Sequence, residues 1–187
     1  MKKIVTSLIT LAAFAAQAQS ASYSVDPTHT FVHFEASHFG TSTLRGRFDK
    51  KDGSISFDRA AKTGRAEITI DMASINTGVA PFDKHLKSKD FFDTDNHATA
   101  KFVGDKFSFN GDKVSEVAGT LTMLGKTMPV TLKATGFNCY TSPFFKREVC
   151  GGDFEATVQR SQYGMSYGLP GIPDNIRLLV QIEAVKQ

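Results

Sequence analysis

Large apolar residues recur at every second position through most of the chain after residue 30, with Lys, Glu, Thr and Ser between them. Because the side chains of a β-strand point alternately to its two faces, this pattern predicts strands with one apolar face. The clearest case is a segment in which Ala66, Ile68, Ile70 and Met72 alternate with polar residues. A long series of such strands must either fill a core or line a cavity.

The same alternation predicts further strands before and after this segment. Their apolar positions are Val32, Phe34 and Ala36; Leu44, Gly46 and Phe48; Ala98, Ala100 and Phe102; Phe107 and Phe109; Gly119, Leu121 and Met123; Val130, Leu132 and Ala134; Phe154, Ala156 and Val158; and Ile176, Leu178, Val180, Ile182 and Ala184. Two dipeptides between them are typical of hairpin turns, Asp52-Gly53 and Asn110-Gly111.

The two-residue rhythm breaks where Val79, Phe82 and Leu86 are spaced three and four residues apart, with Pro81 near the start. This spacing predicts one short helix near residues 79–89. Eight or nine antiparallel strands with one helical insertion predict an all-β fold, either a closed barrel or a two-sheet sandwich. An eight-stranded barrel is filled by its own side chains or holds one slender ligand, and the periodicity fits both.

The N-terminus has the pattern of a secretory signal peptide. Lys2 and Lys3 precede a largely apolar run, and Ala16 and Ala18 provide the small residues of a cleavage site. The alternative is an uncleaved N-terminal anchor, although the run is shorter than the roughly 20 residues of a membrane-spanning helix. We expect residues 1–18 to be removed and residues 19–187 to form a single exported domain.

Removal of the leader also changes the charge. Lys plus Arg falls from 22 to 20 against 19 Asp plus Glu, so the mature chain is nearly neutral. With no cluster of basic residues, this balance argues against nucleic-acid binding as the main task. The two cysteines, Cys139 and Cys150, are predicted to form a disulfide in an oxidising compartment, since a redox-active pair usually has only two residues between its cysteines.

Five histidines raise the question of a metal site. On one strand, His29 and His33 would lie roughly 13 Å apart at about 3.3 Å per residue, and His38 would point to the opposite face. A metal would therefore need His85 or His97 as well, and we favour solvated histidines and no metal. The motifs of common hydrolases and phosphate-binding loops are absent from the sequence, so we predict no catalytic residues and no cofactor.

Two polar residues are in phase with the apolar faces of their strands, His38 and Arg160. A guanidinium on an apolar face is costly unless it is paired. One interpretation is a polar clamp for a ligand head group at the barrel mouth. The other is an internal salt bridge to Asp83, Asp90 or Asp93, or a strand that ends before residue 160.

Between the cysteines, Tyr140, Phe144 and Phe145 lie close together near Pro143. Exposed apolar residues of this kind can contact a membrane, a partner or a ligand. We favour the alternative that they fold back over the end of the barrel.

Several segments, read in order, resemble the YceI-like family of bacterial polyisoprenoid-binding proteins, and together they span nearly the whole mature chain. They are residues 26–30 (DPTHT), Phe34 with 38–40 (HFG), 45–48 (RGRF), 74–78 (SINTG), 83–93 (DKHLKSKDFFD), 119–123 (GTLTM), 129–132 (PVTL) and 160–165 (RSQYGM). The cysteine hairpin is not part of this pattern.

The resemblance implies a lipocalin-like antiparallel barrel, exported to the periplasm and often dimeric, with a long tunnel for an isoprenoid such as ubiquinone or a prenyl phosphate. Carried onto this chain, the ligand-binding residues are Val32, Phe34, His38, Phe48, Ile68, Ile70, Met72, Phe102, Leu121, Met123, Phe154, Val158, Arg160, Leu178 and Val180.

We therefore expect a protein that binds and carries an isoprenoid lipid or quinone, with transient membrane contact and no membrane span. An enzyme acting on such a lipid is the first alternative, with Arg160, His38 and His85 as candidate groups. A surface or partner-binding domain that uses the segment from Tyr140 to Phe145 is the second.

Overall fold

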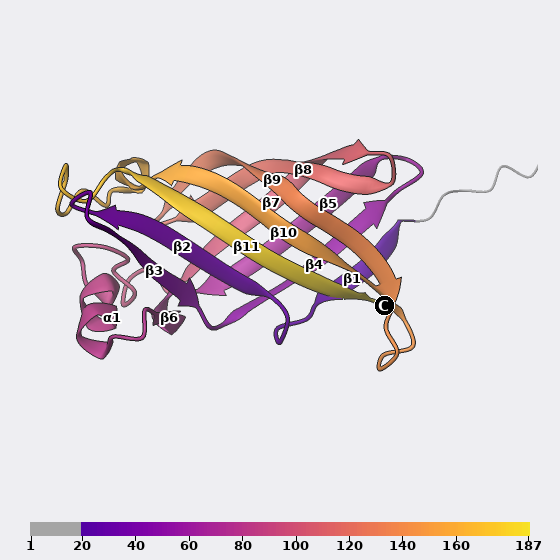
Figure 1. Ribbon diagram of the computed structural model, residues 1–187, viewed down its shortest axis with the longest axis horizontal. Coiled ribbons are helices and arrows are strands. Elements are labelled where there is room, and N and C mark those ends of the chain that lie inside the picture. The colour runs from indigo at the N-terminus through magenta and orange to yellow at the C-terminus, as the bar shows by residue number, and fades with distance from the viewer. Residues whose placement is uncertain (1–19) are drawn as a thin grey trace, which may run out of the picture.

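A computed structural model describes residues 20–187, and the predicted leader, residues 1–18, lies outside the described residues. The barrel is elongated, and its strands run obliquely to the long axis (Figure 1). The elements are β1 Ala21–Val25, β2 Phe31–His38, β3 Ser42–Phe48, β4 Lys51–Asp58, β5 Thr63–Asp71, η1 Met72–Ser74, β6 Ile75–Asn76, α1 Ala80–Lys87, β7 Thr99–Asn110, β8 Lys113–Met123, β9 Lys126–Thr141, β10 Glu148–Gln159, η2 Arg160–Tyr163 and β11 Asn175–Lys186.

Eight of the strands close into a barrel. Neighbours around it are β1, β4, β5, β7, β8, β9, β10 and β11, and β11 returns to pair with β1. All of these pairings are antiparallel. The eight-stranded antiparallel barrel predicted from the sequence is therefore confirmed.

The other three strands, β2, β3 and β6, extend the sheet from a second stretch of β11. Residues 184–186 of β11 pair with β1, whereas residues 177–181 pair with β2. Between these stretches, the hydroxyl of the buried Thr30 donates to the Glu183 carbonyl and accepts from the Glu183 amide, both at 3.2 Å. The Thr30 side chain thus supplies hydrogen bonds to the main chain of β11 at a residue that pairs with neither β1 nor β2.

The turn predicted at Asp52 and Gly53 is wrong. Both residues lie inside β4, and the chain passes from β3 to β4 through Asp49 and Lys50 without reversing its direction. β3 and β4 do not pair with each other, because β3 lies between β2 and β6 while β4 lies between β1 and β5. The glycine permits a close approach of strands, since a Cβ at position 53 would collide with the main-chain oxygen of Glu67.

β-Bulges change the inward face from even to odd positions within three long strands. Register shifts leave Asp105 unpaired in β7, Ser115 in β8 and Thr135 in β9. Because each bulge inserts one residue, the side chains that follow it switch to the opposite face. This switch brings Phe107 and Phe137 to the interior. The two segments predicted around Phe102 and Phe109 form one continuous strand, β7, with the bulge between them.

The helix predicted near residues 79–89 is confirmed as α1, which lies at one end of the barrel (Figure 1). The Asp83 carboxylate accepts hydrogen bonds from the Thr77 amide at 2.7 Å and the Thr77 hydroxyl at 2.6 Å, which fixes the start of the helix. Leu86 is the residue that the helix buries. Within residues 20–187, no helix has the length and apolar character needed to cross a membrane.

Candidate functional site

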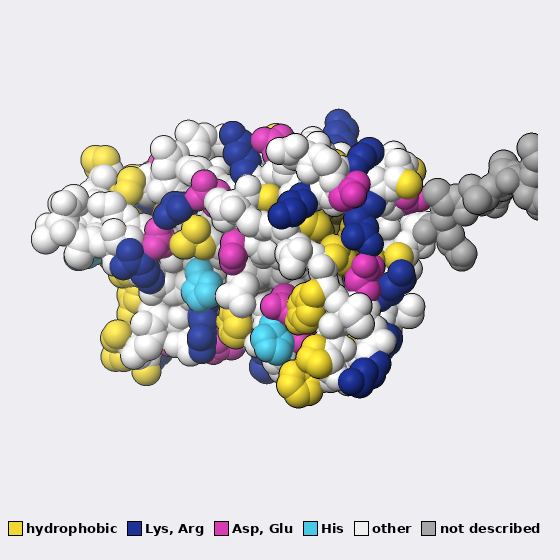
Figure 2. All heavy atoms as spheres, turned by 45° about the vertical axis from the view of Figure 1, so that its right-hand side comes forward, with side chains coloured by type: hydrophobic (Ala, Val, Ile, Leu, Met, Phe, Trp, Pro, Cys, Tyr) yellow, Lys and Arg dark blue, Asp and Glu magenta, His cyan; other side chains and the backbone are white. Residues whose placement is uncertain are grey.

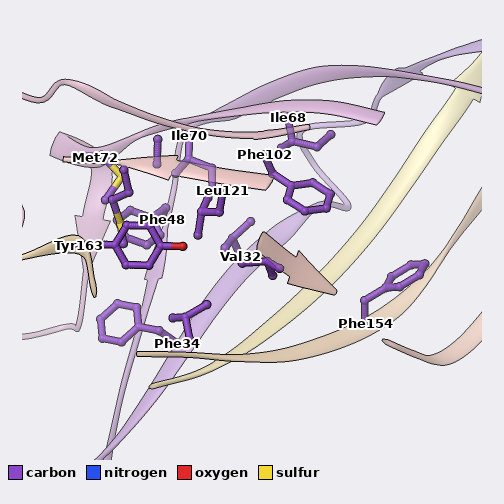
Figure 3. Packing of buried hydrophobic residues seen from close by; sticks show 14 of the residues in the cluster. Val32, Phe34, Phe48, Ile68, Ile70, Met72, Phe102, Leu121, Phe154 and Tyr163 are labelled. Atoms are coloured by element: carbon purple, nitrogen blue, oxygen red, sulfur yellow. The ribbon is translucent and has the colours of Figure 1, made fainter. Parts of the chain in front are cut away.

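A cavity of about 650 Å³ lies inside the barrel and is lined by residues from one end to the other. Its volume falls within the range of about 300–1,000 Å³ that is typical of small-molecule sites. Figure 3 shows inward side chains from several strands, among them Val32, Ile70, Phe102 and Leu121, around the interior. Among the lining residues that the structure describes, Arg160 is the only Lys, Arg, Asp or Glu.

All fifteen residues predicted to bind the ligand line this cavity. Most are apolar residues that alternate with half-buried or exposed neighbours, so the face assignment from the two-residue rhythm agrees with the structure wherever the strands are unbroken. Their contact with a ligand stays a prediction.

The predicted ligand-binding set omits the lining residues at the end of the barrel opposite α1, including Tyr23, Phe57, Phe107 and Phe137, although the alternation assigns Phe107 to an apolar strand face. Tyr23 and Val25 alternate with serines in β1, so the alternation typical of a strand is present here, although the segment is short. Phe107 and Phe137 follow the bulges, where the phase of the preceding residues no longer predicts the inward face.

The end of the barrel near α1, here called the mouth, is formed by the β2–β3 turn, α1 and residues 160–174 (Figure 1). Phe39 is 66% exposed and Tyr167 50% exposed, and both line the cavity, which therefore reaches solvent here. Ser37 and His38, at the end of β2, are exposed lining residues as well. The His38 ring contacts Phe39 edge-on, with 4.8 Å between the ring centroids.

His85 is the second histidine of the mouth, and it has partners of its own. Its Nε2 lies 3.0 Å from the Asp90 carboxylate, and its ring meets Phe91 and Tyr167 edge-on at 5.1 and 5.0 Å. Among the described residues no hydrogen bond joins His85 to His38 or Arg160, the other groups considered for an enzyme.

Arg160 follows the last residue of β10 and is 3% exposed. Its guanidinium donates to three main-chain carbonyls, those of Pro173 at 3.1 Å, Met165 at 3.1 Å and Ile172 at 2.9 Å. Burial lowers the pKa of Arg160, and the nearby Asp174 opposes this shift. The arginine thus holds the loop of the mouth together.

Arg160 lies just beyond its strand, which ends at Gln159 as one interpretation supposed. The described residues contain no ion pair between Arg160 and Asp83, Asp90 or Asp93. Nε, Nη1 and Nη2 each donate to a carbonyl, so three of the five N–H groups of the guanidinium serve the loop and two are left for a ligand.

The opposite end of the barrel, here called the hairpin end, is closed by aromatic rings. Tyr23 stacks on Phe57 with 4.9 Å between centroids, and Phe57 meets Phe137 edge-on at 6.2 Å. Cys139 and Cys150 face each other across β9 and β10 and form the predicted disulfide. Cys150 is buried and lines this end of the cavity.

An ion-pair network surrounds these rings. The Tyr23 hydroxyl donates to Glu148 at 2.6 Å, and Arg59 pairs with the same carboxylate at 2.8 Å. Lys186 lies 3.8 Å from it. The hydrogen bond from Tyr23 and these cations lower the pKa of Glu148, while burial and that hydrogen bond raise the pKa of Tyr23.

His29 and His33 lie apart from the cavity, and each has its own surroundings. His29 Nδ1 is 2.7 Å from the Asp26 carboxylate, and this contact raises the pKa of the imidazole. His33 is half-buried, and burial together with Arg47 and Lys51 lowers its pKa. The solvated interpretation therefore fits His29 better than His33.

We expected the turn between β9 and β10 to fold back over the end of the barrel, and this prediction is wrong. Phe144 is 89% exposed, Tyr140 47% and Phe145 46%. The turn is held by Ser142, whose hydroxyl accepts from the amides of Phe144 and Phe145 at 3.3 and 3.2 Å. The two phenylalanines therefore stand on an ordered turn.

Comparison with known sequences gives consistent matches along the chain. The model of a family described as YceI-like domain matches residues 23–184. A UPF0312 protein of Pseudomonas putida is 37% identical over 177 residues, which cover 92% of this chain and 91% of the relative. A UPF0312 protein of Pseudomonas aeruginosa is 34% identical over 176 residues, with the same coverage.

Solved structures share the fold. BcnA of Burkholderia cenocepacia superposes with a TM-score of 0.67 at 23% identity, covering 85% of this chain and 98% of that one. The Campylobacter jejuni YCEI protein gives 0.67 at 26% identity, covering 78% and 86%. A domain from Saccharophagus degradans, described as polyisoprenoid binding, gives 0.62 at 16% identity and covers 89% and 99%.

Proposed function

Because the chain belongs to the YceI-like domain family, we propose that it binds an apolar isoprenoid lipid inside the barrel and carries it through the periplasm. The observation that carries this proposal is the cavity of about 650 Å³, which runs along the barrel between apolar side chains. An isoprenoid tail offers few groups for hydrogen bonding, and burial at about 0.8 kcal/mol per CH₂ is enough to hold it. The description of the Saccharophagus degradans domain as polyisoprenoid binding also supports it.

The distribution of polar groups favours one direction for the ligand. Ser37, His38, His85 and Tyr167 line the cavity at the mouth, whereas Tyr23 at the hairpin end donates its hydroxyl to Glu148. A polar head group would therefore lie at the mouth, near water, and the tail would extend toward the hairpin end.

The charges favour an uncharged head group, such as that of a quinone, over a prenyl phosphate. Arg160 is the one Lys, Arg, Asp or Glu among the described residues that line the cavity, and three of its five N–H groups already donate to main-chain carbonyls. A phosphate in this cavity would find at most two N–H groups of a single cation, and burying its charge among apolar side chains is costly.

Export and assembly complete the proposal. The disulfide Cys139–Cys150 and the leader pattern of residues 1–18 support a periplasmic location, where disulfides persist. Transient contact with a membrane would let the lipid enter and leave. The family resemblance further suggests a homodimer, which analytical ultracentrifugation of the purified protein would test.

Native mass spectrometry and organic extraction of the purified protein test the ligand. We expect an extractable isoprenoid, and a protein that is repeatedly isolated empty and takes up no added ubiquinone would contradict the proposal. Charged substitutions of the lining, Phe34→Asp and Ile70→Asp, should abolish uptake, but they place a charge on a buried face and threaten folding as well.

A matched pair on β11 separates uptake from folding. Leu178 lines the cavity, whereas its neighbour Leu179 does not. Leu178→Trp should therefore obstruct the tail and lower the amount of bound lipid, while Leu179→Trp should leave it near the wild-type level. Equal lipid contents in two folded variants would show that the lipid lies elsewhere.

A further inference from the structure

We propose that the β9–β10 turn, residues 142–147, is a membrane-docking tip that recognises an anionic lipid surface. Phe144 and Phe145 are exposed at its end, next to Lys146 and Arg147, which are exposed as well. In the view of Figure 2, yellow hydrophobic side chains lie beside dark blue Lys and Arg side chains at the lower margin, where the hairpin of Figure 1 projects. This docking does not depend on what the cavity holds.

The tip is built to hold the phenylalanines outward. Beyond the two Ser142 hydroxyl contacts, the Ser142 amide donates to the Arg147 carbonyl and the Lys146 amide to the Ser142 carbonyl, both at 2.9 Å. The disulfide joins the two strands below the turn. An ordered turn inserts its aromatic rings without first losing conformational freedom.

The charge around the tip complements an anionic surface. Within residues 20–187, Lys146 and Arg147 form no ion pair, so their charges are free for lipid phosphates. The nearest acidic residue along the chain, Glu148, is already neutralised by Arg59 and Lys186. Basic residues at an anionic membrane surface each strengthen binding about five-fold.

The size of the tip favours a bilayer over a protein partner. A stable protein–protein interface buries about 800 Å² per partner, which a convex turn of six residues does not offer. A second copy docked tip to tip would bring Lys146 and Arg147 against the same basic residues. Insertion of two rings into the interfacial region of a bilayer requires no complementary pocket.

The experiment uses the absence of tryptophan from the chain. Phe144→Trp introduces a single tryptophan at the tip, and Val79→Trp places one at the exposed residue before α1, outside the lining of the cavity. With vesicles of phosphatidylcholine and phosphatidylglycerol, we expect a blue shift of the emission for position 144 and none for position 79. A shift at position 79 alone would mean that the end of the barrel near α1 docks instead, and would overturn the proposal.

Flotation with the same vesicles measures the contribution of each part of the tip. Phe144→Ser combined with Phe145→Ser should lower vesicle binding at least about ten-fold, and Lys146→Gln combined with Arg147→Gln should abolish the preference over pure phosphatidylcholine. All four residues are exposed, so circular dichroism should show unchanged folding. Wild-type binding by the serine variant, or a change of oligomeric state without a change of vesicle binding, would refute the docking tip.

Discussion

The two ends of the barrel each contain a tyrosine that is 2% exposed, yet only one of them has a hydrogen-bond partner. Tyr23, at the hairpin end, donates to Glu148, whereas the hydroxyl of Tyr163, at the mouth, has no partner among the described residues. The difference reflects how each end is built. The hairpin end is closed by side chains from paired strands, and the mouth by an irregular segment that Arg160 holds through main-chain carbonyls.

The hairpin end is built on regular strand pairing, whereas at the mouth one buried guanidinium joins three carbonyls of an irregular segment. Loss of that one group should therefore disturb the mouth more than loss of one group disturbs the hairpin end. An irregular segment at the mouth also suits the proposed uptake of a long ligand, because loops open more readily than paired strands.

The largest effect is expected for Arg160→Ala at the mouth. The substitution leaves three carbonyls without their donor, so the free energy of unfolding should fall by about 3 kcal/mol in urea titrations. Arg45→Ala is the matched control, because this arginine pairs with Glu35 at 2.7 Å but is 67% exposed, and its loss should cost less than about 1 kcal/mol. Similar losses for the two variants would show that the mouth does not depend on Arg160.

Removal of the disulfide is expected to have the next largest effect, on the hairpin end. The bond joins residues 11 apart, and Cys139→Ala with Cys150→Ala should lower the free energy of unfolding by about 2–3 kcal/mol. Amide hydrogen exchange should quicken in residues 137–152 and stay unchanged in residues 160–174. Faster exchange throughout both segments would mean that the two ends do not open independently.

Tyr23→Phe removes one contact from the same end. The hydroxyl donates to a carboxylate, so we expect a loss of about 1–2 kcal/mol, measured by urea unfolding at neutral pH. Arg59 and Lys186 still pair with Glu148 in this variant, and the end should stay closed. A cost below about 0.5 kcal/mol would indicate that those two cations carry the network without the tyrosine.

Acid titration sharpens this result. Because the folded-state pKa of Glu148 is lowered, chiefly by the hydrogen bond from Tyr23, its contribution to stability is present above the ordinary value of 4.5 and is lost as the pH falls toward the lowered pKa. In Tyr23→Phe the pKa of Glu148 should lie closer to 4.5. The difference in stability between wild type and variant should therefore shrink below that pH, and a constant difference would contradict this account.

The unequal ends also explain how far the sequence could predict this molecule. Alternation identified the inward face of β2, β5 and β11, because these strands keep one phase through Phe34, Ile70 and Leu178. Alternation did not predict that Thr30 divides the pairing of β11 between two strands, and it did not predict the bulges that change the phase. Both features depend on strands that are distant in the sequence.

The candidate site shows the same division between periodic and irregular segments. All of the predicted lining residues face the cavity, but the role of Arg160 could not be read from its phase. Its partners lie in residues 165–173, a segment without periodicity, and the groups that it binds are main-chain carbonyls that every residue has. No pattern of residue types marks such partners.

The smallest effect is expected for Tyr163→Phe, the counterpart of Tyr23→Phe. Its buried hydroxyl has no hydrogen-bond partner within residues 20–187, and burial raises the pKa of Tyr163, so removing this group from water destabilises the fold. Figure 3 shows the hydroxyl pointing toward the interior, among apolar side chains that include Phe48 and Met72. Loss of the oxygen should leave the free energy of unfolding unchanged or raise it by up to about 1 kcal/mol. A clear destabilisation would mean that the hydroxyl has a partner such as an ordered water, and the two tyrosines would then be equivalent.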